Sequence, residues 1–511
     1  MDISNDNKRI AKNTLMLYIR MLLVMAVSLY TSRVMLNALG IADYGIYNIV
    51  GSVVVAFSFI SGPLGTATQR FLSYELGRKN FSKLNTLFSL SLFIYILLAI
   101  VLFFVIEIAG QWFIHYKMQL PAERLSAAIW AFHFSVLSFI ISLFKICFDA
   151  LIISHEKMAF YAYLGIAEVI LKLVNALSIV YCTSDKLILF ALNLTLISAL
   201  ILFFMIIYCK KKMLHIRIRF VWDKAIFKEL FGFSGWSLFG SIASMSANQG
   251  LNILLNTFYG VVVNAAMGIA NQVGVAVNQF VINFQTAFRP QIVKSYASGQ
   301  LESLKILIMN TSKYSFLLLF GLVCPIVFNI HFILEVWLKN VPLYAAEFCI
   351  LMLIYALLET LSAPMWMTIQ ATGHIRLYQL VISSVIFLNI LLSYVFLRMG
   401  FSPVIVLKIK CCLDVAYLLV RLFFIHKLIQ FSIYQYMKAV GLRLTAIVLL
   451  SFMVTYTLSL LPVDRWERLI FTCIGFICVY VPTTFYIGLN INERNLLVRV
   501  LKKQLCRENK I

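Results

Sequence analysis

The stretch LFSLSLFIYILLAIVLFFVI, residues 87–106, decides the class of fold. It is a run without a single charge, and about 20 such residues are what an α-helix needs to cross the hydrocarbon core of a bilayer. The rest of the chain has the same character. Of its 511 residues, 62% are hydrophobic and only 13% are charged, whereas soluble domains are about half apolar and a quarter charged. The sequence therefore predicts an all-α integral membrane protein.

Windows of about 20 mostly apolar residues recur along the chain and predict about fourteen transmembrane helices. The expected ranges are 13–37, 45–65, 85–108, 124–148, 160–182, 187–209, 231–257, 263–287, 306–330, 346–369, 377–398, 403–427, 439–460 and 469–490. Lys and Arg gather in the connectors on the N-terminal side, where Arg70, Arg289 and Lys294 are expected to lie. This bias predicts that both termini are cytoplasmic.

Two segments of the sequence resemble each other. The motif Leu36–Gly40 recurs loosely as Leu255–Gly260, and Thr66-Ala67 recurs as Thr286-Ala287, each followed by an Arg and a Tyr. The offset covers six expected helices, so both copies would enter the membrane in the same orientation. It predicts two pseudo-symmetric six-helix lobes related as parallel repeats, residues 1–215 and 216–430. Two additional C-terminal helices and a basic tail would follow in 431–511.

Charged side chains inside the expected helices are the first candidates for a functional site, because each costs roughly 2.5–3.5 kcal/mol to insert. Arg20 and Arg33 of the first helix are candidate substrate-binding cations, with Asn37 on the face of Arg33. Arg20 is the deeper of the two, and Arg33 could instead snorkel to the interface. Lys410 and Arg421 of the twelfth helix are the other candidate cations, since Arg presents a fork that matches phosphate.

Five further charges are candidates for a coupling-ion site or for structural ion pairs. Glu168 and Lys172 are four residues apart and can pair on their own helix. Glu359 could titrate, or could pair with Lys313 of the preceding helix. Asp414 shares a helix face with Lys410, Tyr417 and Arg421, and the stripe could hold a phosphate or form a structural network.

Two stripes of amide side chains occur at helical spacing in the seventh and eighth expected helices. The substrate-binding candidates among them are Asn248, Asn252, Asn256, Asn271 and Gln272. Such stripes suit a hydrated path that offers hydrogen bonds to sugar hydroxyls. The alternative is that small and amide residues only hold helices together.

Several kinds of site are missing from the sequence. It has no Gly-rich phosphate loop, no Walker lysine and no metal-ligand spacing among its 10 Cys. No catalytic residue, metal, cofactor or nucleic-acid partner is therefore expected. Transport would draw on an ion gradient or the membrane potential, because the chain has no ATP site.

The motif LNxLGxxDYGxYN at residues 36–48, together with TATQRFLSYELGRKN at 66–80, carries a family resemblance. Residues 8–83 resemble the Wzx-type O-antigen and polysaccharide flippases of the multidrug/oligosaccharidyl-lipid/polysaccharide exporter superfamily. The resemblance implies a bacterial inner-membrane protein that moves undecaprenyl-pyrophosphate-linked oligosaccharide outward by alternating access through a cationic cavity. In this chain Arg20 would suit contact with the phosphate.

The resemblance implies further partners and leaves rivals open. The cargo would be a polyprenyl-pyrophosphate-linked oligosaccharide surrounded by membrane lipid, and polysaccharide polymerase machinery is a possible partner. A cation-coupled multidrug exporter of the same superfamily is the nearest alternative and would use a buried carboxylate. A membrane polysaccharide polymerase or ligase is a weaker alternative, because the connectors are short.

Overall fold

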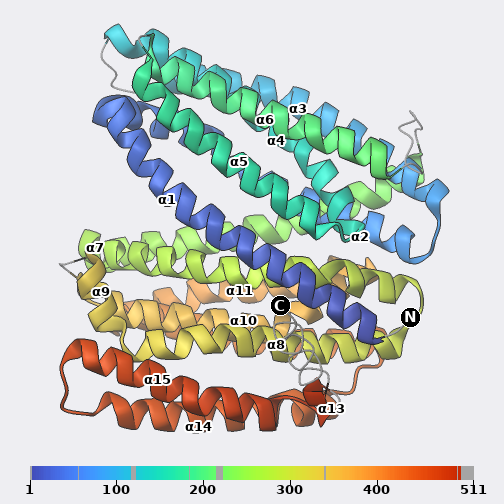
Figure 1. Cartoon of the computed structure of the whole chain (residues 1–511), viewed down its shortest axis with the longest axis vertical. Helices are drawn as coiled ribbons and strands as arrows, with labels where there is room; N and C mark the ends of the chain where they lie inside the picture. The colour runs from blue at the N-terminus through green and yellow to red at the C-terminus, as the bar shows by residue number, and fades with distance from the viewer. Residues whose placement is uncertain are drawn as a thin grey trace, which may run out of the picture. The chain divides into compact units, whose positions relative to one another are not determined.

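The computed structural model describes residues 3–55, 57–116, 122–182, 184–213, 223–338, 341–491 and 493–495. Within these ranges it does not describe the side chains of residues 3–12, 29, 32, 33, 36, 41, 42, 48, 49, 52, 53, 55, 122 and 261. Every regular element in the described residues is helical (Figure 1). The expectation of an all-α chain is confirmed.

Fifteen α-helices are assigned in these ranges. They are α1 (Ile3–Val55), α2 (Ser61–Gly77), α3 (Phe81–Tyr116), α4 (Leu125–Ser154), α5 (Met158–Ser178), α6 (Lys186–Lys212), α7 (Lys224–Ala297), α8 (Leu301–Phe328), α9 (Ile330–Leu338), α10 (Ala345–Thr372), α11 (Arg376–Arg398), α12 (Ile405–Ile429), α13 (Ile433–Tyr436), α14 (Leu442–Ser459) and α15 (Arg465–Thr483). Short 3-10 or π segments adjoin several of them.

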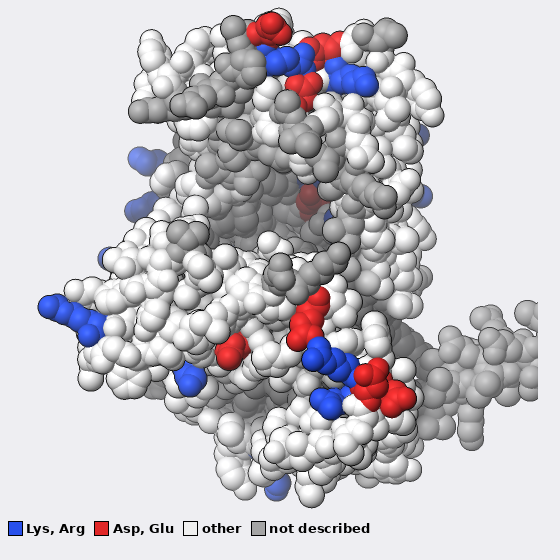
Figure 2. Space-filling model, turned by 90° about the vertical axis from the view of Figure 1, so that its left-hand side faces the viewer, with Lys and Arg blue, Asp and Glu red and all other residues white. Residues whose placement is uncertain are grey.

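Ten helices of the described residues are long and apolar enough to cross a membrane. The chain is thus a multi-pass membrane protein. The expected ranges 13–37, 231–257 and 403–427 are helical, but these segments are not among the ten. The range 45–65 was wrong in its bounds, because α1 ends at Val55 and α2 begins at Ser61. On the face shown in Figure 2, most side chains are neither acidic nor basic, as lipid contact requires.

Glycine breaks mark the internal repeat. Gly40 interrupts α1 and Gly260 interrupts α7, each with a φ of 76°, a value that side chains other than Gly rarely adopt. The turn after α2 has Lys79 at φ 57°, and the turn after α7 has Gly299 at φ 74°. Both pairs are 220 residues apart, which is the offset the sequence motifs predicted. The arrangement of two lobes with boundaries at 215 and 430 stays a prediction.

The chain divides into two compact units. Unit 1 consists of Met1–Ser244, Asn283–Leu301 and Gln370–Val381. In it, α1 packs along α5, and α4 packs against α2, α3 and α6. Buried apolar side chains such as Leu143 and Ile152 fill the space around α4.

Unit 2 consists of Met245–Ile282, Glu302–Ile369 and Ile382–Ile511. Its main apolar core joins α7, α9, α10 and α12, with Leu255, Leu334, Phe348 and Leu407 buried in it. The last two long helices, α14 and α15, lie side by side within this unit (Figure 1). Asn329 and Thr472 tie α15 to the end of α8 through a buried hydrogen bond of 2.9 Å.

Candidate functional site

Three charged side chains of unit 1 form a connected ion-pair group inside the expected membrane region. Glu168 on α5 accepts a hydrogen bond from Nζ of Lys172 at 2.7 Å and a second one from Nζ of Lys145 on α4. The pair within α5 was expected from its spacing. Lys145 was not named in the sequence interpretation, although a Lys inside an apolar run was a usable signal.

Arg20 lies beside this group, in a seat made for a guanidinium. Its Cζ is 4.4 Å from the ring centroid of Tyr161, a distance typical of a cation–π contact. Gly165, one turn further along α5, makes the seat possible. A Cβ at this position would lie 2.2 Å from Nε of Arg20, so only Gly leaves room for the side chain. Nε itself is buried and has no hydrogen-bond partner among the described residues.

Asp149 completes the charged group in unit 1. It follows Lys145 by one turn of α4 and interacts electrostatically with Lys145, Arg20 and Glu168. Its Oδ1 is buried and finds no donor in the described part of the chain. We name Arg20, Lys145, Asp149, Glu168 and Lys172 the unit-1 cluster. It contains three cations and two carboxylates, so its cations are in excess.

A second charged group lies in unit 2, where the sequence expected a cationic stripe on α12. Nζ of Lys410 is 3.3 Å from Oδ1 of Asn248 on α7 and 4.4 Å from the ring centroid of Tyr355 on α10. Nη1 of Arg421 donates a hydrogen bond to Oγ of Ser362 on α10. The stripe therefore faces α10 and α7 within this unit.

Two carboxylates accompany these cations. Asp414 is 2% exposed, and its Oδ2 has no hydrogen-bond partner among the described residues. Glu359 interacts electrostatically with Asp414 and Lys410. We name Glu359, Lys410, Asp414 and Arg421 the unit-2 cluster, which has equal numbers of both signs.

Glu359 does not pair with Lys313, which was one of the two alternatives for this carboxylate. Lys313 of α8 is 2% exposed, and its Nζ is 2.8 Å from Oε2 of Glu493, which follows α15. Burial opposes ionisation of Glu493, but hydrogen bonds from Lys313 and from the backbone N–H of Asn490 lower its pKa. This ion pair attaches the segment after α15 to α8.

The amide stripes of α7 contact the unit-2 cluster only in part. Asn248 contacts Lys410, whereas Asn252 bonds to Gln249 of its own helix at 3.5 Å. Asn256 and Gln272 are exposed, and Asn271 is half-buried. Exposed amides fit a hydrated surface, but they do not meet in one pocket.

The two remaining candidates belong to α1. Asn37 is exposed and lies three residues before the break at Gly40. The side chain of Arg33 lies outside the described residues. Asn37 makes no contact with the unit-1 cluster among the described residues.

Unit 1 also holds contacts among helix ends that the sequence interpretation missed. Glu156, just after α4, accepts hydrogen bonds from Nζ of Lys294 at 2.7 Å and from Nε2 of Gln291 at 3.3 Å. At the end of α2, a Cβ on Gly77 would lie 2.8 Å from the backbone of Lys294. Tyr74 and Tyr296 have ring centroids 6.5 Å apart. The ends of α2, α4 and α7 are thus tied together.

Arg70 and Arg289 correct the expected topology on this side of unit 1. Both were expected in connectors, yet Arg70 lies in α2 and is 6% exposed, and Arg289 lies within α7. Nη2 of Arg70 donates to the carbonyl oxygen of Ala371 at 3.0 Å, and Nη1 is 3.8 Å from Oε1 of Glu229. The buried guanidinium is accommodated because these partners replace water.

Neither a protein-family model nor a curated protein sequence matches the chain. Solved structures do. A MATE transporter in complex with MaL6 aligns with a TM-score of 0.69 and 14% identity, over 82% of this chain and 96% of the other. An outward-facing MATE family transporter of the MOP superfamily aligns with a TM-score of 0.68, at the same identity and coverage. The chain has the fold of these transporters.

A third structure with the MATE fold is a MOP superfamily transporter from Pyrococcus furiosus, described by the reverse polarity of its binding pocket. It aligns with a TM-score of 0.68 and 14% identity, over 82% of this chain and 96% of the other. Identity this low establishes the fold alone. The charges of the chain itself must therefore carry the functional argument.

Proposed function

We propose that the chain is a flippase that moves a polyprenyl-pyrophosphate-linked oligosaccharide from the inner to the outer leaflet of a bacterial cytoplasmic membrane by alternating access. The MATE fold supports a transporter, and the sequence resemblance over residues 8–83 supports this cargo. A polysaccharide polymerase would use the product on the outer side.

The seat of Arg20 is the observation that carries the proposal. Its guanidinium lies within a predicted membrane span, in a cluster whose cations outnumber its carboxylates, and its Nε has no hydrogen-bond partner among the described residues. A cation at that depth is costly unless something compensates its charge. A pyrophosphate that leaves water likewise needs cations and hydrogen bonds in place of its hydration. The guanidinium thus supplies positive charge and hydrogen bonds to the pyrophosphate, and the pyrophosphate supplies negative charge to the guanidinium.

Flipping of a fluorescent lipid-linked oligosaccharide in liposomes tests the proposal, with and without an imposed membrane potential. We expect Arg20→Ala to lower the initial rate at least tenfold. Arg20→Lys should keep part of the activity, because Lys retains the charge but loses the bidentate fork. Arg465→Gln is the matched control, since Arg465 is 65% exposed and pairs with the exposed Glu335.

Displacing the guanidinium without removing it provides a second test. Gly165→Ala places a methyl group 2.2 Å from Nε of Arg20 and must push the side chain out of its seat. We expect Gly165→Ala to slow flipping in the same direction as Arg20→Ala. Wild-type rates for both variants would contradict the proposed role of Arg20, and no movement of any glycan by the wild-type protein would contradict the flippase.

A cation-coupled multidrug exporter is the second candidate function. The buried oxygens of Asp149 and Asp414 that have no donor favour it, because carboxylates of this kind can bind a proton or a cation. Under this alternative, Asp149→Asn and Asp414→Asn would abolish drug resistance conferred on a sensitive host. Glycan flipping would then be absent from the wild-type protein.

A further inference from the structure

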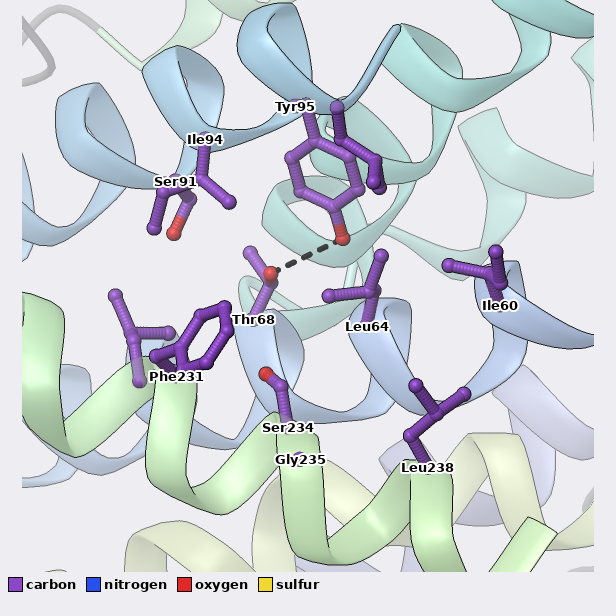
Figure 3. A pocket seen from close by; sticks show the side chains of 12 residues that line it. Ile60, Leu64, Thr68, Ser91, Ile94, Tyr95, Phe231, Ser234, Gly235 and Leu238 are labelled. Carbon is purple, nitrogen blue, oxygen red and sulfur yellow. Dashed lines mark hydrogen bonds between the residues drawn. The ribbon is translucent and has the colours of Figure 1, made fainter. Parts of the chain in front are cut away.

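An apolar cavity in unit 1 is separate from both charged clusters. It has a volume of about 160 Å³ and lies between η1 (Ser58–Ile60), α2, α3 and the first turns of α7 (Figure 3). Its walls are mostly apolar, with Leu64, Phe231 and Leu238 among them. Phe231 is 65% exposed, so the cavity adjoins the exposed surface of α7.

Two hydroxyl groups in the cavity wall satisfy each other. The hydroxyl of Tyr95 on α3 is 3.2 Å from Oγ1 of Thr68 on α2, and both side chains are buried. Figure 3 shows the two hydroxyl groups facing each other. Because Tyr95 and Thr68 pair in this way, the wall of the cavity remains mostly apolar.

The cavity extends from one leaflet to beyond the middle of the bilayer. Leu230 lies six residues after the start of α7 at Lys224, and Leu64 lies thirteen residues before the end of α2 at Gly77. At 1.5 Å per residue these positions are roughly 9 Å and 20 Å from the helix ends, on the two sides of the midplane of a hydrocarbon core of ~30 Å. The end of the cavity at Leu230 therefore lies in the leaflet on the side predicted to be cytoplasmic.

A lysine lies about one turn of α7 before the wall of the cavity. Lys228 of α7 is exposed and makes no ion pair among the described residues. It precedes Phe231 by three residues and Gly235 by seven, so all three share one face of the helix. Lys228 is thus about 5 Å nearer the helix end than Phe231. A phosphate at Lys228 with an apolar chain in the cavity would match both features.

We infer that this cavity binds the isoprenoid chain of the cargo next to its pyrophosphate, before the head group enters the transport path. The inference rests on the proposed flippase function. A dry apolar cavity of about 150 Å³ holds a molecule of six carbons, so this cavity fits one branched five-carbon isoprene unit. Lys228 would compensate the charge of the pyrophosphate that is attached to the first isoprene unit.

Filling the cavity tests the inference directly. A Cβ added at Gly235 meets no atom within 4 Å, so the helix accommodates Gly235→Leu. Because Gly235 lines the cavity, the new side chain fills part of it. Gly232 is the matched control, because it lies on the same helix outside the lining and its added Cβ also has free space. The full-length protein in nanodiscs is labelled with undecaprenyl diphosphate that carries a diazirine in its first isoprene unit.

We expect cross-links to residues 91–98 and 230–238 in the wild type, reduced at least fivefold in Gly235→Leu and unchanged in Gly232→Leu. Lys228→Gln should reduce labelling by the diphosphate but not by undecaprenol. Equal labelling of wild type and Gly235→Leu overturns the inference. So does equal labelling of the cavity by phosphatidylglycerol with a diazirine in its acyl chain, which would make this an ordinary lipid site.

The two proposals fail separately. If the wild type flips glycans in liposomes and Gly235→Leu binds and flips normally, the cavity is not a chain site and the flippase stands. If the wild type flips no glycan yet labels as expected, the chain site stands and the flippase does not.

Discussion

Replacing Glu156 by Gln tests whether its contacts hold the ends of α2, α4 and α7 together within unit 1. The side chain of Glu156 is 4% exposed and accepts hydrogen bonds from Lys294 and Gln291. Its backbone has a φ of 59°, a left-handed conformation that costs a residue other than Gly roughly 1–2 kcal/mol. Backbone hydrogen bonds of the turn after α4, from Glu156 to Ile153 and from Lys157 to Ile152, support this conformation, and the side chain then reaches α7.

The size of the effect follows from these contacts. Gln keeps the shape of Glu and can still accept from Gln291, but it loses the charge that faces Lys294. A hydrogen bond to a charged group contributes about 1.5–3 kcal/mol. The side chain of Lys294 is 26% exposed, so water replaces part of the lost interaction. A net loss of about 1–2 kcal/mol would raise the ratio of molecules whose helix ends have separated to molecules whose helix ends are in contact about 5- to 30-fold.

Spin labels at Asn80 and Gln300 report this ratio through their distance distribution in nanodiscs. Both residues are exposed and lie in the turns after α2 and α7, next to the close approach of Gly77 and Lys294. We expect a longer-distance population to grow in Glu156→Gln. The same substitution at Glu302, which is 84% exposed, should leave the distribution unchanged.

A distance distribution in Glu156→Gln that overlays the wild type would refute the argument. It would mean that the contacts of Gly77 and of the Tyr74–Tyr296 pair suffice to keep these ends together. An equal change in the Glu302 control would also refute it, since the effect would then be one of surface charge.

Two further predictions concern the backbone of α1 and the segment after α15. Gly40→Ala should lower the free energy of unfolding by about 1–3 kcal/mol because of the φ of 76°; thermal denaturation in detergent measures this, with Gly45→Ala as a control that should change little. Glu493 has a pKa lowered from 4.5, so the stability that its pair with Lys313 provides is present above about pH 4.5 and is lost as the pH falls through the lower folded-state pKa. The protection factors of residues 489–495 against hydrogen exchange, which correct for the intrinsic pH dependence of the exchange rate, should therefore fall below pH 4.5 in the wild type but stay constant in Glu493→Gln.

The helices were predictable from the sequence because lipid demands long apolar windows, and the two breaks were visible as glycines at equivalent positions. The course of α2 was not predictable. Arg70 was expected in a connector, yet it lies in a helix that continues to Gly77. Its guanidinium is tolerated there because another segment covers it with the carbonyl oxygen of Ala371. Burial of this kind depends on how other segments pack against α2, which the sequence of α2 alone does not show.

The same limit applies to the charged groups. The pair of Glu168 and Lys172 follows from spacing on one helix, so the sequence predicts it. The partners of Glu168 and Lys313 on other helices lie 23 and 180 residues away. Two candidate acids were available for Lys313, Glu359 and Glu493, and only the packing of the segment after α15 decides between them.

Arg20 would bind the head group of the cargo, whereas the cavity would bind its isoprenoid chain. Substitutions at the two places should therefore have independent effects on flipping. Arg20 contacts Tyr161 and Gly165, and neither of these residues lines the cavity. Effects of sites without shared partners usually add within about 0.3–0.5 kcal/mol. Arg20→Ala and Gly235→Leu should therefore reduce flipping by the product of their separate factors. If the double variant is no slower than the worse single variant, head group and chain are held by one coupled site, and the division of the cargo between the two places is wrong.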